Sequence, residues 1–225
     1  MKTYDELMAE GLGLEQLGDR REAALVFDLA ADCAPESYGL VSAKQRAGIN
    51  YRCAGQSYFE VSLSRFSEAF TVATKPLQEH DKDSRMMLLL STVERDWAML
   101  KLAQGDYNTA ISLLNDALNT QETLRNPREA GCTRGFLARV LWQSGRNASA
   151  RRLFARADRE LKDKPDWRLN NAIWWMKASS PLRRLIIGPR AIWLAYSSGF
   201  RRRAAEAVII MVGGNRLYER LKRAA

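Results

Sequence analysis

The sequence is poor in the residues on which metal, disulfide and hydrolytic chemistry depend. It has one histidine, His80, in the charged stretch QEHDKDS, and three cysteines, Cys33, Cys53 and Cys132, far apart and without CxxC spacing. It contains neither an HExxH nor a GxxxxGK[ST] motif. Three cysteines cannot complete a disulfide framework, so we expect partly buried thiols in a reducing compartment. We therefore expect no metal site, no cofactor and a binding protein rather than an enzyme.

Long apolar runs are also absent. No stretch of 18 apolar residues occurs, and the first residues carry acids from Asp5 onward, so we expect neither a membrane-spanning helix nor a secretory signal. Only 14 glycines and six prolines punctuate a chain that is 46% hydrophobic and 27% charged. This composition is that of a globular protein and favours helices. We expect a cytoplasmic location.

The net charge of +9 is concentrated at one end of the chain. Residues 168–225 hold 12 Lys and Arg and two acids, which gives +10 for this segment. Residues 1–167 then hold 23 basic and 24 acidic residues and are nearly neutral. A charge asymmetry of this kind bears on partners rather than on the fold.

Three segments of the near-neutral part share one pattern. Each has a turn glycine, an alanine five residues later, a large apolar residue four further on and a second alanine three beyond that. Because glycine ends a helix in a left-handed conformation and small residues allow two helices to cross closely, the pattern predicts antiparallel helix pairs. A fourth, degenerate copy is predicted at 64–76, with Ser64 at the turn. The three full copies are Gly18/Ala23/Phe27/Ala30, Gly105/Ala110/Leu114/Ala117 and Gly145/Ala150/Phe154/Ala157.

This register resembles the tetratricopeptide repeat over about residues 4–161, most clearly at Gly-Asp-Tyr (105–107) followed by Ala110 and Ala117. The turns recur every 40 to 46 residues, against a usual period of about 34. The resemblance implies an all-α solenoid whose concave surface binds a protein or peptide segment. Carried over through the register, the family's groove positions fall on Tyr58, Arg95, Arg139 and Trp142. The two arginines are expected to be exposed, while Tyr58 and Trp142 could equally fill gaps between repeats.

The sequence after residue 164 has a different character. Trp167, Ile173 and Trp174 lie at helical spacing and predict a capping helix over 165–179. Residues 180–225 form amphipathic pieces with basic faces, predicted as a basic helical tail after a repeat domain at 1–164. Such a tail suits an anionic membrane surface, an intramolecular cap or, with less support, nucleic acid. The residues predicted to contact a membrane are Arg183, Arg184, Arg190, Trp193, Arg201, Arg202 and Arg203.

Two kinds of function fit this organisation. The first is a scaffold or adaptor that holds a partner segment in the groove while its tail contacts the inner face of the cytoplasmic membrane. The second is an accessory or regulatory module acting in trans on an enzyme. At the level of composition, the tail is similar to the C-terminal ends of some bacterial envelope-polysaccharide glycosyltransferases. A nucleic-acid-binding regulator is disfavoured, because the arginine triplet stands beside apolar stretches and no DNA-binding motif is visible.

Overall fold

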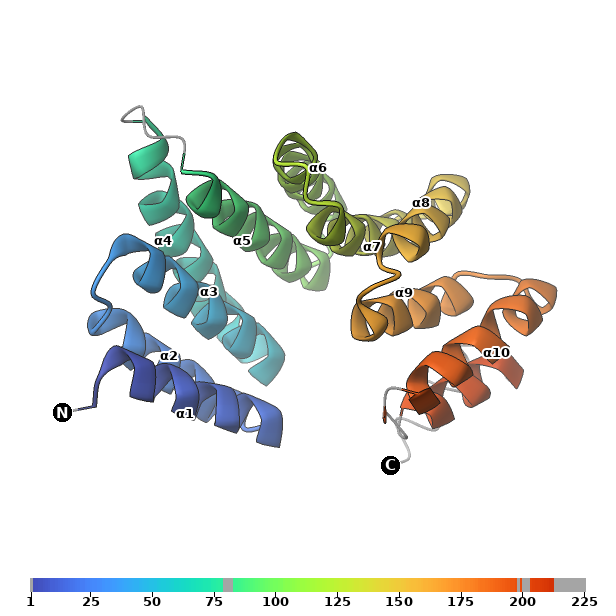
Figure 1. Ribbon diagram of the computed structural model, residues 1–225, viewed down its shortest axis with the longest axis horizontal. Coiled ribbons are helices and arrows are strands. Elements are labelled where there is room, and N and C mark those ends of the chain that lie inside the picture. Colours follow the sequence, from blue (N-terminus) through green and yellow to red (C-terminus); the bar gives the residue numbers. More distant parts are fainter. Residues whose placement is uncertain (1, 79–82, 198, 200–202, 213–225) are drawn as a thin grey trace. The chain divides into compact units, whose positions relative to one another are not determined.

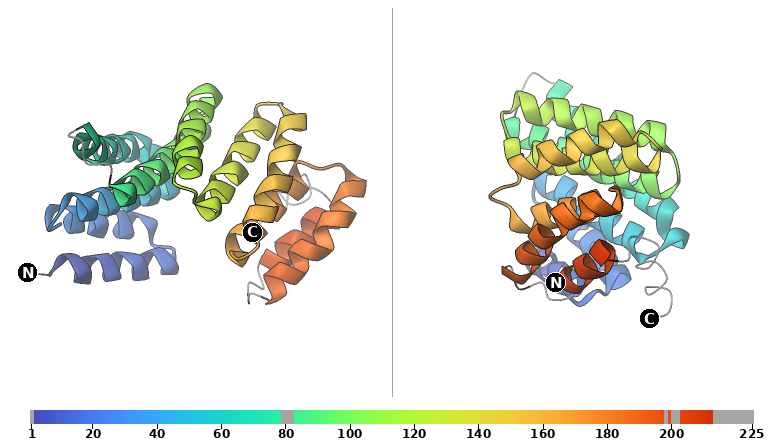
Figure 2. Two further views of the ribbon diagram at one scale, coloured as in Figure 1. Left: turned by 45° about the horizontal axis from the view of Figure 1, so that its top comes forward. Right: turned by 90° about the vertical axis from the view of Figure 1, so that its right-hand side faces the viewer.

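The computed structural model describes residues 2–78, 83–197, 199 and 203–212, and within these ranges it contains helices and no strand. The chain forms two compact units, Met1–Leu124 (unit 1) and Arg125–Ala225 (unit 2). In each, helices that follow one another in sequence pack side by side (Figures 1 and 2). The predicted α-solenoid of antiparallel pairs is confirmed as the fold class, while the boundaries at 164 and 179 stay predictions.

Unit 1 contains six α-helices in its described part. The first helix begins at a capping box in which the Thr3 hydroxyl accepts from the Glu6 N–H and the Glu6 carboxylate accepts from the Thr3 N–H. The helices are α1 (Tyr4–Leu17), α2 (Arg20–Asp32), α3 (Ser37–Ala54), α4 (Phe59–Gln78), α5 (Ser84–Ala103) and α6 (Tyr107–Thr123), with a short 3₁₀ helix, η1 (Gln56–Tyr58), before α4.

Unit 2 contains two helix pairs and one further described helix. Asn126 caps the first helix by accepting from the Glu129 N–H at 3.2 Å, and Pro127 occupies the first helical position, where no N–H is needed. The elements are α7 (Pro127–Gln143), α8 (Asn147–Glu160), α9 (Pro165–Lys177), α10 (Pro181–Ser197) and the helical residues 203–212.

The predicted turn glycines are confirmed in all three full copies. Gly18, Gly105 and Gly145 have φ values of 93°, 81° and 83°, in the left-handed region that glycine adopts without steric cost. The alanines and the large apolar residues of the register are completely buried. The sequence therefore specifies both where each pair turns and how closely its helices approach.

The fourth copy was predicted in the wrong register. Ser64 lies inside α4, where its hydroxyl donates to the Glu68 carboxylate at 2.7 Å, and the chain turns earlier, at Gly55. The small-large-small set of this copy is instead Ser62, Phe66 and Ala69, all completely buried. The error arose because serine is compatible with a helix as well as with a turn.

Glycines of the first helix of a pair receive the large residue of the second. A Cβ on Gly11 would lie 2.6 Å from the Phe27 ring, and one on Gly48 would lie 3.0 Å from the Phe66 ring. Ser62 adds a hydrogen bond across the second crossing by donating to the Gly48 carbonyl at 2.7 Å. The aromatic rings therefore pack directly on the backbone of the neighbouring helix.

The α9 segment forms a pair with α10 rather than ending the stack alone. A continuous apolar cluster, the tail core, joins α9, α10 and the helix at 203–212. It lies on both sides of residue 179, and Gly188 of α10 provides the room for Met211. The tail core consists of Leu169, Ala172, Ile173, Met176, Ile187, Ala191, Leu194, Ala195, Ala207 and Ile210.

Candidate functional site

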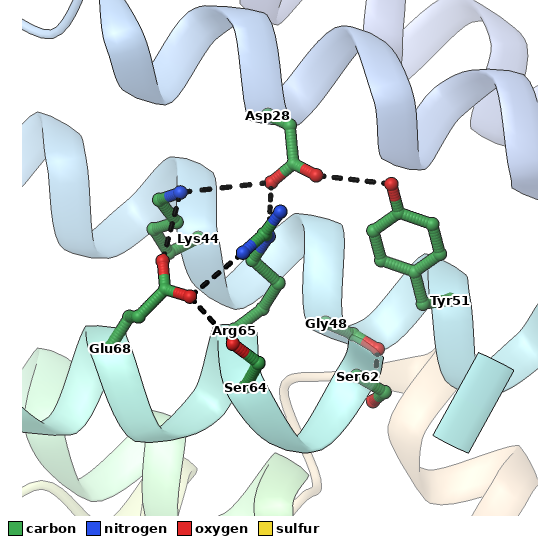
Figure 3. Close-up of polar contacts among 8 residues, drawn as sticks. All are labelled: Asp28, Lys44, Gly48, Tyr51, Ser62, Ser64, Arg65 and Glu68. Atoms are coloured by element: carbon green, nitrogen blue, oxygen red, sulfur yellow. Dashed lines mark hydrogen bonds and ion pairs between the residues drawn. The ribbon is translucent and has the colours of Figure 1, made fainter. Parts of the chain in front are cut away.

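A cluster of charged side chains joins α2, α3 and α4 in unit 1 (Figure 3). Asp28 of α2 accepts from the Arg65 Nε at 2.7 Å and from the Tyr51 hydroxyl at 3.0 Å. Glu68 accepts from Arg65 at 2.8 Å and forms an ion pair with Lys44 at 3.0 Å. The acids and bases neutralise one another and are largely screened from solvent, so the cluster serves as a clamp between three helices.

Two pKa shifts follow from this clamp. Burial, together with the charge and hydrogen bond of Asp28, raises the pKa of Tyr51 to about 12. Burial pushes the pKa of Glu68 up, but hydrogen bonds from Ser64, Lys44 and Arg65 outweigh it, so the pKa lies below its ordinary value. Both shifts keep the groups in the charge states that the clamp requires near neutral pH.

A second polar feature of unit 1 is a buried carboxyl group on α5. Glu94 is 9% exposed, and its Oε2 has no hydrogen-bond partner. Burial, with a smaller contribution from the charge of Asp116 on α6, raises the pKa of Glu94 from 4.5 to about 7. The group therefore changes charge within the physiological pH range.

We expect Glu94→Gln to make unit 1 more stable above neutral pH. The folded state holds the Glu94 proton more tightly than the unfolded state does, so the contribution of this one group to stability is fully present below pH 4.5 and is lost as pH rises through about 7. The glutamine variant avoids this loss and should exceed wild type by about 1–3 kcal/mol at pH 8 and match it near pH 4. Urea titrations over this range provide the measurement, with exposed Glu60→Gln as control. A constant difference between the two proteins across pH would contradict the assignment.

Unit 2 contains a cavity of about 440 Å³ between α7, α9 and the helix at 203–212, and this cavity is the candidate ligand site. Aromatic rings supply its apolar surface, and Phe136 packs edge-on against Trp167 with ring centroids 5.6 Å apart. The lining residues, called here the unit-2 pocket, are Cys132, Gly135, Phe136, Arg139, Leu161, Trp167, Asn170, Asn171, Ile173, Trp174, Lys177, Arg203 and Glu206.

Cations surround one tryptophan of the unit-2 pocket. The Arg139 guanidinium carbon lies 3.9 Å from the centroid of the Trp174 ring, and the Lys177 Nζ lies 4.6 Å from it. The negatively charged group of the lining is Glu206, which pairs with Lys177 at 3.3 Å and with Arg203 at 3.0 Å. The lining residues that the structure describes include three cations and one carboxylate, and a ligand with an anionic group beside an apolar one suits this composition.

Asn171 brings an unused hydrogen-bond acceptor to the same pocket. Its side chain is 5% exposed, and its Nδ2 donates to the Phe154 carbonyl at 3.0 Å. Its Oδ1 has no hydrogen-bond partner, and it lies close to Gly135, where an added Cβ would be 3.2 Å away. A buried acceptor without a donor is costly, and because this oxygen is almost inaccessible to solvent, the cost belongs to the packing of α9 on α7 rather than to a ligand contact.

The structure brings together two of the four predicted groove residues. Arg139 lines the unit-2 pocket, and Trp142 lies beside it with its ring centroid 6.1 Å from that of Trp174. Tyr58 instead stacks on Tyr51 at 6.0 Å, half-buried against the apolar cluster around Phe27.

The expected exposure of the two arginines was wrong. Arg95 is 7% exposed, with its Nε 3.9 Å from Asp96, because α5 is buried on nearly every side. Arg139 is half-buried, because it stacks on Trp174. Whether any of the four contacts a partner stays a prediction.

The residues predicted to contact a membrane fall into three groups. Arg183 and Trp193 are exposed on α10. Arg184 donates from Nε to the Ser179 carbonyl, Arg190 pairs with Asp158 at 2.9 Å, and Arg203 lies at the unit-2 pocket. Arg201 and Arg202, like His80 in the predicted linker, lie outside the described residues.

Sequence reasoning missed the pocket role of Asn171 and Lys177 and assigned Trp167 and Trp174 to a capping helix. The available signal was the helical spacing of Trp167, Asn171 and Trp174, which places an amide between two rings on one face. Cys132 lines the pocket, whereas it was predicted only as a partly buried thiol.

The described part of the chain contains neither a membrane-spanning helix nor a metal-binding cluster. No helix there is long and apolar enough to cross a membrane. No group of three or more His, Cys, Asp or Glu residues among the described residues is placed to hold a metal ion.

Comparisons with known proteins show what this chain is similar to. A family model described as tetratricopeptide repeat matches residues 88–157. Comparison with curated protein sequences gives no match.

The similarity to solved structures extends over nearly the whole chain, whereas the family model covers one part of it. The chain is similar to pilF of Pseudomonas aeruginosa, with a TM-score of 0.57, 19% identity and coverage of 99% of this chain and 97% of that one. It is also similar to BtubC (BKLC) from P. vanneervenii, with a TM-score of 0.61, 12% identity and coverage of 98% and 80%. A third likeness is to TPR-like repeats from Podosopora anserina, with a TM-score of 0.58, 12% identity and full coverage of both chains. At these identities the likeness shows the fold.

Proposed function

Because the chain is a helical repeat protein of the tetratricopeptide kind, we propose that it is a scaffold that binds a segment of a partner protein in the unit-2 pocket. Repeats of this kind generally mediate protein–protein interactions and are typically non-catalytic. The observation that carries the proposal is the cluster of Arg139, Trp174 and Lys177, an aromatic ring with two cations close to it in the lining of the unit-2 pocket.

The chemistry of the unit-2 pocket favours a partner segment with an acidic residue next to an apolar one. The cations of the lining attract a carboxylate, while Phe136 and Trp167 offer rings to a neighbouring apolar side chain. A segment with these features matches both the charge and the apolar surface of the unit-2 pocket.

The C-terminal part of the chain gives this scaffold a place of action. Residues 168–225 carry a net charge of +10, while the rest of the chain is nearly neutral. This concentration of positive charge supports contact with an anionic membrane surface. We propose that the protein works at the inner face of the cytoplasmic membrane. The basic segment would hold it there while the unit-2 pocket holds the partner.

An accessory or regulatory module acting in trans on a membrane-associated enzyme, such as an envelope-polysaccharide glycosyltransferase, is the second form of this function. The same basic segment favours it, since it would bring the module to a membrane enzyme. The two forms differ in their effect on the bound partner. If adding the protein changes the enzymatic rate of its partner, the protein is a regulatory module, and if the rate is unchanged, it is a scaffold.

We expect Trp174→Ala to reduce partner capture at least about tenfold, because it removes the ring between two cations and part of the apolar surface. Asn170→Trp should have the same effect by filling the unit-2 pocket without removing a contact of Trp174. Quantitative mass spectrometry of proteins retained from lysate of the source cells measures capture, with Tyr107→Ala, an exposed aromatic residue of unit 1, as matched control. Circular dichroism melts show that the variants are folded. Equal capture of every partner by wild type and both folded pocket variants would refute the site.

A further inference from the structure

One face of α10 exposes large apolar side chains along its whole length. Leu182 and Ile186 are each 78% exposed, Trp193 is 66% exposed and Tyr196 is 75% exposed. Their spacing of four, seven and three residues places them in one line, which spans about 21 Å at the rise of an α-helix. Leu185, also exposed, lies beside this line. We call these five residues the α10 stripe.

The opposite face of α10 is already used. Ile187, Ala191 and Leu194 belong to the tail core and pack against α9 and the helix at 203–212. A rotation of α10 that buried the α10 stripe would withdraw these residues from the tail core. The stripe is therefore fixed in its outward orientation by the packing behind it.

Arginines border the α10 stripe, and α10 contains no acidic residue. Arg183 is exposed next to Leu182. Arg190 is held at the side of the helix by its ion pair with Asp158, and the Arg184 Nε donates to the Ser179 carbonyl at 3.1 Å. The helix thus presents an apolar line with cationic margins, the pattern of a helix that lies in the headgroup region of an anionic bilayer.

We propose that α10 is an interfacial helix: it lies in the plane of an anionic membrane, with the α10 stripe in the acyl boundary and the exposed Arg183 among the lipid phosphates. This rests on the membrane contact proposed above and assigns that contact to one helix face. Trp193 and Tyr196 suit this position, because an aromatic ring with a polar tip favours the headgroup layer. The apolar face, rather than the arginine triplet, then supplies the part of the affinity that salt does not remove.

A second copy of the chain fits the α10 stripe less well. Two α10 helices packed along their stripes would bring like charges together, and although Asp158 pairs with Arg190, α10 itself carries no carboxylate to offset Arg183. A lipid surface with anionic headgroups meets the same arginines with opposite charge. Charge complementarity therefore selects the membrane.

Flotation of the full-length protein with lipid vesicles tests the assignment. Wild type should float with mixed phosphatidylcholine and phosphatidylglycerol vesicles, and should float less with pure phosphatidylcholine. The double variant Ile186→Ser/Trp193→Ser should lose about tenfold or more of the partitioning at both low and high salt, since it removes apolar insertion. Leu25→Ser/Leu29→Ser is the matched control, because these two leucines are exposed on α2 of unit 1 and should not matter.

The variant Arg183→Glu separates the electrostatic contribution to vesicle binding from the apolar contribution. This variant should lose partitioning at about 0.01 M salt, where the Debye length is about 30 Å, and resemble wild type at about 1 M, where it is about 3 Å. If wild type does not float with anionic vesicles, the membrane contact and the role of α10 both fail, whereas the pocket proposal is untouched. If wild type floats and the stripe variant floats equally well, the contact stands and the α10 assignment is overturned. Light scattering covers the remaining case: a wild-type dimer that the stripe variant dissociates, without vesicle binding, identifies the stripe as a self-association surface and overturns the proposal.

Discussion

Phe66→Ala should lower the free energy of unfolding of unit 1 by about 3–5 kcal/mol, as expected for a fully buried phenylalanine whose neighbours cannot close the gap. The ring is completely buried and packs on the backbone of Gly48, within a cluster that includes Val41 and Leu100. Denaturant titration measures the loss. Val61→Ala is the control on the same helix, because Val61 is exposed and its truncation should change stability by about 0.5 kcal/mol or less.

A double-mutant cycle with Gly48 tests the cause of this loss. Gly48→Ala alone should destabilise the protein, since its Cβ would lie 3.0 Å from the Phe66 ring. In the Phe66→Ala background the same methyl group has room, and the better helix propensity of alanine should add about 1 kcal/mol. A Gly48→Ala effect of the same size and sign in both backgrounds would show that the ring and the glycine do not interact, contrary to the close packing described here.

Asp28→Ala should cost about 2–4 kcal/mol, the second large effect. The change leaves the Tyr51 hydroxyl without its acceptor and takes from Arg65 and Lys44 one of two carboxylates. Hydrogen bonds to a charged group are worth about 1.5–3 kcal/mol each, and partial solvent access keeps the sum below that of a fully buried network.

Thermal or denaturant unfolding of Asp28→Ala provides the measurement, with Asp32→Ala as control at the exposed end of the same helix. Arg65→Met in the Asp28→Ala background should then cost less than in wild type, because Arg65 has already lost one of its two carboxylate partners. Additive losses, or a loss no larger than that of Asp32→Ala, would show that the clamp in Figure 3 contributes little to stability.

The fold could be predicted because the turn glycines and the small residues impose it locally. Gly18, Gly105 and Gly145 need a left-handed backbone wherever the pairs stand, and these positions were found. Ser64 misled because its side chain suits both a turn and a helix, and the Glu68 carboxylate one turn later favours the helix. The facing glycines Gly11 and Gly48 were not recognised, since their role depends on a ring that comes from another helix.

The site was less accessible to sequence reasoning. Arg139 and Trp142 were found by register, but the residue that organises them, Trp174, comes from the next helix pair. Arg95 was expected to be exposed but is buried. Helical periodicity shows on which face of a helix a residue lies, but it does not show whether another helix covers that face. Side-chain direction and the sharing of partners between helices depend on tertiary packing, which one sequence does not display.

Within each unit, helices contact their neighbours in sequence, and the first helix of one pair also contacts the first helix of the next, as α3 does α5 and α7 does α9. Native contacts are therefore close along the chain, and little loop entropy must be lost before the first of them forms. Proteins with such low contact order fold in about microseconds to milliseconds. The same locality makes the chain tolerant of growth: a whole helix pair can be gained or lost between two others, while each remaining pair keeps the contacts between its own two helices.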